Sequence, residues 1–531
     1  MQARGSPSLA ESRRNGFNQS MSESKPQISG RVFFVGAGPG DPKLITLRGM
    51  ECLQRADVVI YDYLVNSQVL SHARPTAQLI CLGNLEGTRN LSQAQVNQRM
   101  VELARQGKTI VRLKGGDPAV FARIAEEGET LACHGIPFEV VPGITAALAA
   151  ASYAGIPITH RDYASAVALI TGQEEPGKSD PSLDYQALAM FPGTLAFYMG
   201  VANAEAWTTA LIQGGKPPDT PAAIVRRCSF PNQVCIRCRL DEVAQKLVSP
   251  VKMPPPAVVI VGSVAGLAET LSWFEKRPLF GHCVLVTRPA DQAGSLAERL
   301  SELGAEVMLQ PAIQISDPPD WRPVDGALER LASYDWLVFS SSNGVHYFLN
   351  RLLAGGADLR RLGGVRLAAI GPGTAQALAA FHLKADIIPD EFRAESMAAS
   401  LAVEARGKRF LLARASRGRE VLSDQLRSAG AHVDQIVVYS STDVAIADEE
   451  VLRRLADGGI HWVTVTSSAI ARSLAALFGE NLRKTRLASI SPITSATLRE
   501  LGYEPAVEAG TYTIPGVIES MLQAECRNSS L

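Results

Sequence analysis

The chain has 531 residues, of which 46% are apolar and 20% are charged, and its net charge is −1. This length exceeds what one hydrophobic core supports, so several domains are expected. The nearly neutral charge excludes an overall basic surface, so we expect neither nucleic acid nor membrane as a partner. An anionic small-molecule ligand would need arginines placed locally.

The first 29 residues are polar and lack the apolar stretch of a secretory signal. We expect a disordered tail over 1–29. The most apolar segment, "GITAALAAASYAGIPI", is too short and too interrupted by glycine and proline to span a bilayer. The eight cysteines are scattered along the chain. This usage is typical of a reducing compartment and predicts a cytoplasmic protein.

The glycine-rich stretch "GAGPGD" follows the first strand candidate. A dinucleotide-binding loop has the pattern G-x-G-x-x-G, but Asp41 stands where the third glycine belongs. Pro39 also occupies the point at which such a loop turns into its helix. The pattern argues against an NAD site. An ordinary tight turn and a different kind of ligand loop remain as interpretations.

Strand and helix patterns alternate through the first half of the chain. The segments "RVFFVGAG", "DVVIYD" and "TIVRLKGGDP" read as strands, with amphipathic helix candidates between them. The alternation predicts an α/β fold with a largely parallel sheet. Further short strands follow from about residue 164. The segment "WFEKRPLFG" (273–281) interrupts the pattern, and we place the main domain boundary there.

The segment "CSFPNQVCIRC" holds three cysteines close together. Because "NQVCIRCRL" alternates like a strand, Cys235 and Cys238 are predicted to lie on opposite faces of it. A zinc site would also need a fourth ligand and a turn between the close pair. We therefore expect buried or incidental thiols here and no metal.

The second half contains an internal repeat. "GHCVLVTRPADQAGSLAERLSELGAEV" begins at 281 and matches "GKRFLLARASRGREVLSDQLRSAGAHV" at 407, an offset of 126 (407 − 281). Trp336 and Trp462 keep this offset, whereas "RLAAIGPGTAQAL" at 366 and "RLASISPITSATL" at 486 match at 120 (486 − 366). Such a repeat predicts two similar lobes. Their Ser/Thr/Gly turns and helix N-termini would face a shared cleft.

The ordered motifs of residues 31–264 resemble the tetrapyrrole methylase family, in particular uroporphyrinogen-III C-methyltransferases. The motifs include "GPGDPKLITLRG", "VIYDYLV", "IVRLKGGDPAVF", "TLAFYMG" and "PAVVIVGSV". The resemblance implies two α/β lobes with S-adenosylmethionine bound between them, in a homodimer formed through this domain. It also implies that uroporphyrinogen III is methylated twice, to precorrin-2, on the way to sirohaem and cobalamin.

The same resemblance assigns site residues. Asp62, at the end of "VVIYD", is implied to be the general base, although alone it would read as a helix cap. The residues implied to bind S-adenosylmethionine are Pro39, Gly115, Gly116, Asp117, Val120, Thr145, Ala146, Met199 and Cys228. A polycarboxylate substrate requires arginines, and Arg112 and Arg123 match family arginines. His160 and Arg161 are further candidates that fit a surface-paired capping cluster equally well.

The sequence departs from the methylase pattern at three places. Asn84 stands at the position of a family lysine proposed as proton donor, and asparagine cannot supply that proton. Either the lysine is dispensable, or Lys114 or water substitutes, or methylation is slow; we expect activity to survive. A glycine-rich segment of the family is "ARIAEE" (122–127) here, and Cys228 replaces a cofactor-lining glycine. The cysteine matters little if the contact is made through backbone.

Residues 281–523 resemble the uroporphyrinogen-III synthase family, through the repeat and the motifs "VFSSSNGV", "IVVYSS" and "ISPITSATLRELGYEP". The resemblance implies two flavodoxin-like lobes joined by two crossing strands. The substrate, hydroxymethylbilane, would lie between them and close with inversion of its last ring, without a cofactor. Tyr439 is implied to assist loss of the hydroxyl; a buried strand tyrosine is the alternative.

Polar residues at the repeat-equivalent turns are candidates for binding substrate carboxylates. The same residues fit helix N-caps, and both roles can hold at once. They are Ser340, Ser341, Thr374, Ser467, Ser468 and Thr494. Arg288 and Arg414 are also repeat-equivalent and fit simple surface charges.

These inferences predict a bifunctional enzyme that converts hydroxymethylbilane to precorrin-2. Alternatives are a synthase fused to a methylase of altered specificity, and a tetrapyrrole-binding module with one inactive half. The expected domains are a methyltransferase over 30–275, a linker over 276–280 and a synthase over 281–525. The synthase lobes are expected at about 281–316 plus 441–525, and at 317–440.

Overall fold

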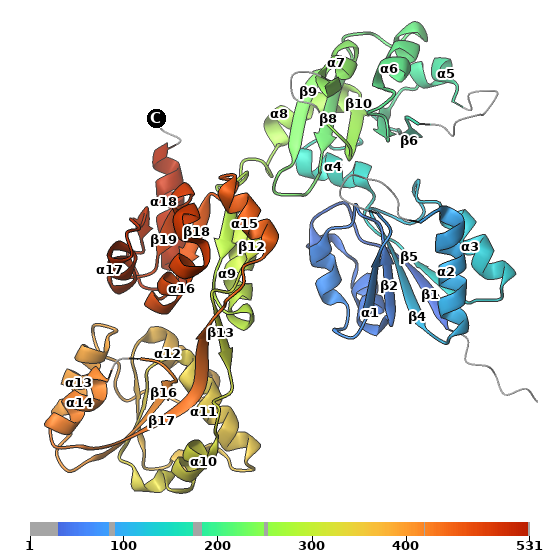
Figure 1. The fold of residues 1–531 in the computed structure, drawn as a ribbon. Coiled ribbons are helices and arrows are strands. Elements are labelled where there is room, and N and C mark those ends of the chain that lie inside the picture. The colour runs from blue at the N-terminus through green and yellow to red at the C-terminus, as the bar shows by residue number, and fades with distance from the viewer. Residues whose placement is uncertain (1–29, 84–90, 174–182, 249–252, 419, 529–531) are drawn as a thin grey trace, which may run out of the picture. The chain divides into compact units, whose positions relative to one another are not determined.

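The computed structural model describes residues 30–83, 91–173, 183–248, 253–418 and 420–528 (Figure 1). These residues form two compact units. The first unit comprises the chain through residue 229 together with 234–269, and the second comprises 230–233 together with 270–531. Each unit contains two five-stranded sheets. The expectation of an α/β fold with parallel sheets is confirmed.

The first sheet of the first unit is entirely parallel, with the order β3-β2-β4-β1-β5. Its strands are β1 (Arg31–Gly36), β2 (Val58–Tyr61), β3 (Gln78–Cys81), β4 (Thr109–Lys114) and β5 (Phe138–Val141). Its covering helices are α1 (Leu47–Arg55), α2 (Gln93–Arg105) and α3 (Ile124–Cys133). Alternate residues of strand β1 pack on α2 and α3 or, on the other face, on α1, so apolar residues fill both faces.

A topological switch point lies between β1 and β4 in this sheet. The chain leaves β1 over α1 toward one edge, and it leaves β4 over α3 toward the other edge. The two helices lie on opposite faces, because α1 and α3 pack in separate core clusters. Open α/β sheets bind ligands outside the carboxyl ends of the strands at such a point. Both glycine motifs, "GAGPGD" and "GGDP", follow directly from these two strands.

The second sheet of this unit is mixed, with the order β6-β7-β10-β8-β9. Its strands are β6 (Val167–Thr171), β7 (Thr194–Tyr198), β8 (Pro221–Arg226), β9 (Val234–Arg239) and β10 (Ala257–Val261). Only β6 and β7 pair in parallel. Helix α4 (Ala146–Ala154) packs on one face, and α5 (Tyr185–Ala189), α6 (Ala204–Gln213) and α7 (Val243–Val248) pack on the other. Strand β9 sends Cys235 and Cys238 to these opposite faces, which confirms that prediction.

In the second unit, one sheet is parallel, with the order β12-β11-β18-β19-β20. Its strands are β11 (Cys283–Val286), β12 (Glu306–Leu309), β18 (Trp462–Val465), β19 (Arg486–Ser489) and β20 (Val507–Glu508). The helices that follow its strands are α9 (Ala290–Glu302), α16 (Ser468–Phe478), α17 (Pro492–Glu500) and α18 (Ile514–Asn528), with α15 (Glu449–Ala456) preceding β18. The short α8 (Ala268–Leu271) precedes β11.

The other sheet of this unit has the order β13-β17-β16-β14-β15. Its strands are β13 (Ile313–Ser316), β14 (Trp336–Phe339), β15 (Arg366–Ala369), β16 (Arg409–Ala415) and β17 (His432–Asp443). Its helices are α10 (Arg322–Glu329), α11 (Ser342–Ala354), α12 (Pro372–Ala380), α13 (Ala394–Ala402) and α14 (Val421–Ser428). All of its pairs are parallel except β13 with β17.

The two sheets of the second unit interleave the two copies of the sequence repeat. Strands β11 and β16 begin 126 residues apart (409 − 283), as do β12 and β17 (432 − 306) and β14 and β18 (462 − 336). Strands β15 and β19 begin 120 residues apart (486 − 366). The first copy therefore supplies β11 and β12 to one sheet and β14 and β15 to the other, and the second copy does the reverse. Two similar sheets result, although neither is built from one copy alone.

Candidate functional site

The glycine motifs of the first unit pair with each other at the switch point. Gly38 and Gly116 form a bridge in which each amide donates to the other's carbonyl, over 3.2 and 2.8 Å. Both have left-handed backbone, with φ of +74° and +71°. A Cβ on Gly143 would lie 2.3 Å from the Gly116 carbonyl, so this contact requires a residue without a side chain. Backbone hydrogen bonds thus join the loops after β1 and β4, and the loop after β5 packs closely against them at Gly143.

Asp117 fixes the neighbouring loop. One carboxylate oxygen accepts from the Gly143 amide over 2.9 Å, and the other accepts from the Ala119 amide over 2.7 Å. The carboxylate of this predicted cofactor residue is therefore committed to the protein. A ligand would meet the backbone of the Gly115–Gly116–Asp117 turn.

Asp41, the residue that breaks the dinucleotide pattern, connects this loop to the rest of the unit. Its carboxylate accepts from the Lys43 amide over 2.9 Å and from the Tyr153 hydroxyl of α4 over 3.0 Å. Its amide donates to the Ser229 hydroxyl, in the loop after β8, over 2.9 Å. A glycine here would lose both side-chain bonds. The departure from the nucleotide pattern therefore has a structural reason.

The loops after β7 and β8 join the same cluster. The Tyr198 hydroxyl lies 2.6 Å from the Thr145 hydroxyl and accepts from the Ala147 amide over 2.9 Å. Cys228 is buried, and its thiol lies 3.8 Å from the Ala146 carbonyl. Burial raises the pKa of this thiol to about 12, so it stays neutral. Only the backbone of Cys228 is available to a ligand. Val120 packs against the same core cluster as Ala146 and Cys228.

Strained backbone concentrates in these loops. Among the described residues, six non-glycine positions have positive φ, and five of them belong to the loops after β4, β7 and β8. These five are Phe121, Arg123, Met199, Arg227 and Ser229. Phe121 and Met199 are 44% and 48% exposed, although both are large apolar residues. Strain of this kind is retained at functional sites, where it holds side chains in position.

A buried charge network lies beneath Asp62, just after β2. Arg112 donates to Asp62 over 2.8 Å and lies 3.4 Å from Glu127 of α3. Lys114 donates to both Glu127 oxygens over 2.9 Å. Arg112, Lys114 and Glu127 are 1%, 3% and 0% exposed, whereas the Asp62 side chain is 20% exposed. Two acids and two bases balance, and only Asp62 reaches the surface.

This network describes the surroundings of two candidate residues. Arg112 was predicted to bind substrate, but its guanidinium is buried and committed to Asp62 and Glu127. Its position follows from the alternation of β4, because it pairs with Ile60 on the face that α3 covers. Lys114 was a possible substitute proton donor, but its ammonium is buried against Glu127. Burial and the neighbouring Arg112 charge lower its pKa. Asn84 lies outside the described residues.

The remaining basic candidates lie at the surface. The Arg123 side chain is 45% exposed, and its guanidinium lies 3.7 Å from Glu126. His160 stacks on Tyr163, with ring centroids 4.6 Å apart, and accepts from the Asp162 amide over 3.1 Å. Arg161 is exposed. The paired surface cluster that was the alternative for His160 describes its observed contacts.

In the second unit, Tyr439 lines a cavity of about 280 Å³ between the two sheets. Its hydroxyl lies 3.0 Å from the Ser341 hydroxyl, and burial raises its pKa. Ser341 and Ser467 accept from amides of α11 and α16 and cap these helices, which confirms the capping interpretation for both. Ser467 lines the cavity. Neither the cavity's Arg288 nor its Arg417 was assigned to the site from sequence.

Four other turn residues differ in their availability. Thr374 and Thr494 are 5% and 2% exposed, one turn inside α12 and α17, so the prediction that they bind substrate stays a prediction without support from their exposure. Their helices are capped three residues earlier, at Gly371 and Ser491, which are themselves repeat-equivalent. Ser468 bonds to Thr497, and Ser340 is exposed beside the cavity residues.

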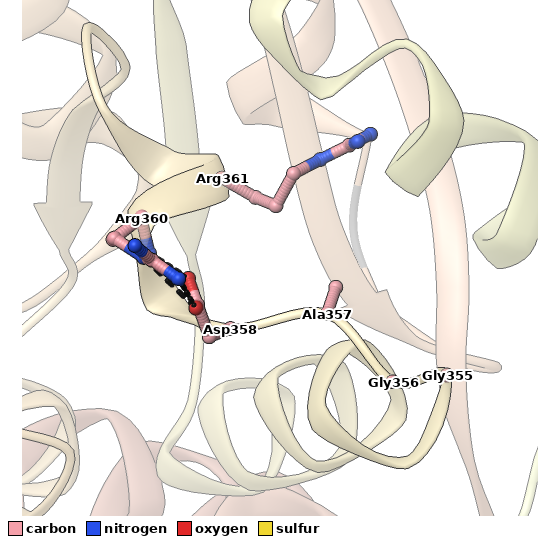
Figure 2. Close-up of a pocket in the computed structure, with 6 residues that line it drawn as sticks. All are labelled: Gly355, Gly356, Ala357, Asp358, Arg360 and Arg361. Atoms are coloured by element: carbon pink, nitrogen blue, oxygen red, sulfur yellow. Dashed lines mark hydrogen bonds and ion pairs between the residues drawn. The ribbon is translucent and has the colours of Figure 1, made fainter.

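A second hollow lies at the loop after α11 (Figure 2). It is lined by the 355–361 segment alone. Arg360 is paired with Asp358 over 2.6 Å, and Arg361 donates to the carbonyls of Leu328 and Glu329. Both guanidinium groups already have protein partners. This surface feature belongs to neither candidate site.

Comparison with known proteins covers both units. Residues 31–244 match the family model of tetrapyrrole (corrin/porphyrin) methylases, and residues 294–519 match that of uroporphyrinogen-III synthase HemD. A porphyrin biosynthesis protein HemD of Ruminiclostridium josui is 34% identical over 92% of this chain and 95% of its own length. The chain belongs to the family of fused tetrapyrrole methylases and uroporphyrinogen-III synthases.

Other proteins are similar to parts of the chain. A uroporphyrinogen-III C-methyltransferase of Bacillus subtilis is 38% identical over 63% of this chain and 68% of its own length. A crystal structure of uroporphyrin-III C-methyl transferase from Thermus thermophilus, complexed with S-adenosyl homocysteine, is 39% identical. It covers 45% of this chain and all of that one, with a TM-score of 0.39. The methylase match includes every loop of the switch-point cluster up to Ser229, and the synthase match includes Tyr439.

No helix among the described residues of this methylase–synthase chain is long and apolar enough to cross a membrane.

Proposed function

We propose that this chain catalyses two consecutive reactions of tetrapyrrole biosynthesis. The second unit cyclises hydroxymethylbilane to uroporphyrinogen III, and the first unit methylates that product twice to precorrin-2. The observation that carries the proposal is the similarity of both units, over 92% of the chain, to one protein of porphyrin biosynthesis. The product of the synthase is the substrate of the methylase, which gives the fusion a chemical reason.

The loops at the switch point fit S-adenosylmethionine. The Gly38–Gly116 bridge holds the two glycine loops together without side chains, and a Cβ on Gly115 would meet only Leu64, at 3.7 Å. Phe121 and Met199 have strained backbone, and their apolar side chains are exposed to solvent. Such a surface suits an adenosyl group. When bound, S-adenosylmethionine supplies an activated methyl group. Pro39, Gly115, Gly116, Val120 and the backbones of Asp117, Thr145, Ala146 and Cys228 would hold it together with Met199.

Asp62 is proposed as the base for methyl transfer. One carboxylate oxygen is held by Arg112, and the partly exposed carboxylate accepts the proton that the methylated macrocycle must lose. Arg112 thereby changes role, from binding substrate to orienting this base. Arg123 is proposed to bind substrate carboxylates, because its side chain is exposed in the loop between β4 and α3.

Tyr439 is proposed to protonate the hydroxyl that leaves hydroxymethylbilane as water. Burial raises its pKa, so the phenol carries its proton at neutral pH. Ser341, 3.0 Å away, fixes the phenol's orientation. The carbon–carbon bond then forms between the ends of the folded tetrapyrrole, and the proton that the attacked pyrrole loses returns to the Tyr439 oxygen.

The full chain incubated with hydroxymethylbilane tests both activities. Without S-adenosylmethionine, we expect uroporphyrinogen III alone. With it, we expect a product heavier by two methyl groups, followed by absorbance and mass. A chain that cyclises but never methylates would support the alternative of an altered methylase, for which Asn84 is the reason. Absence of any cyclic product above the spontaneous rate would refute the synthase assignment.

We further propose a cytoplasmic homodimer formed through the methyltransferase unit. All eight cysteines are free, which agrees with a reducing compartment. Sedimentation of the purified chain under reducing conditions tests the assembly, and a monomer at micromolar concentration would refute it.

A further inference from the structure

Two arginines of the second unit face the Tyr439 cavity from different sheets. Arg288 follows β11 by two residues, and Arg417 follows β16 by two residues. Both line the cavity, together with Tyr439 and Ser467. Each arginine follows the carboxyl end of a strand in a different sheet. Each of the two sides of the cavity therefore carries one cation. This arrangement exceeds what the repeat predicts, because the repeat equivalent of Arg288 is Arg414 (288 + 126) and not Arg417.

The charge of Arg288 has no acidic partner among the ion pairs of the described residues. Its one side-chain hydrogen bond there goes to the neutral Gln292, over 3.3 Å. Gln292 in turn donates to Asn343 of α11 over 2.7 Å, which connects the two walls. Arg414 behaves differently. It is ion-paired with Glu420 and donates to Gln435 over 2.8 Å, and it does not line the cavity.

Arg417 is only partly committed. Its Nε donates to Ser441 over 3.1 Å, and one terminal nitrogen donates to Asp443 over 2.7 Å. The other terminal nitrogen is buried and has no hydrogen-bond partner. A buried donor without a partner is costly, and a bound acceptor would remove that cost. Because an arginine pairs with a carboxylate through two parallel donors, this free nitrogen suits an anionic ligand.

We propose that Arg288 and Arg417 form a carboxylate-binding pair, one from each sheet, that holds a linear polycarboxylate tetrapyrrole against Tyr439. This assignment rests on the proposed synthase function and names the residues that recognise its substrate. The two cations contact separate carboxylates, so the pair also fixes how the flexible chain folds before its ends join. Tyr439 lies on β17 between them and meets the leaving hydroxyl.

The test compares Arg288→Gln, Arg417→Gln and the matched control Arg414→Gln in the full chain. We expect KM for hydroxymethylbilane to rise about tenfold in the first two variants, with kcat within about threefold. The control should keep the wild-type KM, because Arg414 lies outside the cavity. Added salt should raise the wild-type KM more than that of the double variant Arg288→Gln/Arg417→Gln. Methylation of uroporphyrinogen III by the first unit should be unchanged, which confines the effect to the second unit, and the retained kcat verifies that the second unit of each variant is folded.

Several results would overturn the assignment. Equal KM values for all three variants would show that the cavity arginines do not bind substrate. A fall in kcat at unchanged KM would place them in the chemical step instead. Wild-type chain without synthase turnover would refute the proposed function, and this pair with it. Turnover in the wild type with unaltered variants would refute the pair alone.

Discussion

Asp62 reaches the surface on top of charges that are otherwise fully enclosed. Arg112, Lys114 and Glu127 occupy one face of the first sheet, where apolar residues surround them. Enclosed ions cost free energy unless each finds a partner, and here every charge has one. A buried charge network of this kind positions a functional group more than it stabilises the fold. Here Arg112 fixes the orientation of the Asp62 carboxylate.

Replacing Glu127 with Gln should damage the first unit in two ways. Arg112 and Lys114 would be left enclosed without a balancing charge, which costs about 3 kcal/mol or more. Asp62 would be the only anion facing both cations, so methyl transfer should fall with it. Urea-dependent hydrogen exchange of β2 and β4, together with the methylation rate, measures both effects.

Glu126→Gln is the matched control for this change. Glu126 is the preceding residue, and its side chain is 54% exposed. Its replacement should alter stability and methylation little. Equal effects of the two variants would contradict the importance of the enclosed network.

Asp62→Asn should separate cofactor binding from methyl transfer. The variant keeps the size of the side chain and an acceptor for Arg112, but it loses the proton acceptor. We expect the affinity for S-adenosylmethionine to stay within about threefold and the methylation rate to fall about 10²- to 10⁴-fold. Calorimetric titration and single-turnover methylation measure the two quantities. Methylation at the wild-type rate would exclude Asp62 as the base.

At the scale of elements, Glu420 connects two strands and a helix of the second unit. It precedes α14, is ion-paired with Arg414 of β16, and accepts from Gln435 of β17 over 2.7 Å. These hydrogen bonds, that of Arg414 first, lower the pKa of Glu420 from 4.5 to about 2. A carboxyl whose pKa is lower in the folded state stabilises fully above pH 4.5. That contribution is lost as the pH falls from 4.5 toward 2.

Glu420→Gln should therefore weaken the β16–α14–β17 region in a pH-dependent way. We expect its amide protection to be lower than in the wild type at pH 7, with a smaller difference at pH 3. Hydrogen exchange of the two proteins compared at equal pH measures this change. A difference that is the same at both pH values would show that the ion pair contributes nothing.

The sequence motifs predict which elements form the site. They do not predict which face of its helix or strand each side chain occupies. Residues after strand ends, such as Gly116 and Asp117, had to lie at the carboxyl edge of a parallel sheet. Helix phase places Thr494 one turn inside α17, where it faces the core. Strand alternation places Arg112 on a buried face, beside Glu127 of a helix that only the fold brings near. The pattern Ile110–Arg112–Lys114 on one face was the available signal.

Contacts between distant loops were beyond the sequence. The free nitrogen of Arg417 depends on how Asp443 and Ser441 share the rest of its guanidinium. The role of Asp41 depends on Tyr153 and Ser229, 112 and 188 residues away. The repeat itself was visible, but its division between two sheets follows from strand pairing. Pairing order depends on the whole fold and leaves no local pattern.

At the scale of the whole molecule, the interleaved repeat predicts which fragments fold. Residues 313–443 contain all five strands of one sheet, and both core clusters on its faces lie within them. We expect this fragment to unfold cooperatively when expressed alone. The first sequence copy, 281–406, contains strands of both sheets without β16, β17 or β18, and it should not fold.

Thermal unfolding followed by circular dichroism compares the two fragments. They are of similar length, so a difference reflects topology and not chain size. A cooperative transition in 281–406, or none in 313–443, would contradict the strand order described above.

The strands of one sheet lie in the sequence between strands of the other sheet. This order affects how the chain folds during synthesis on the ribosome. Strands β11 and β12 end at Leu309, but their neighbour β18 begins only at Trp462. The 152 intervening residues (310–461) take about 8 to 30 s to translate. During that interval, β11 and β12 lack their neighbour β18, while the inserted lobe completes its own core. A nascent chain of this protein therefore carries exposed β-strand edges for seconds, and chaperone capture in this window would determine how much of it reaches the native state.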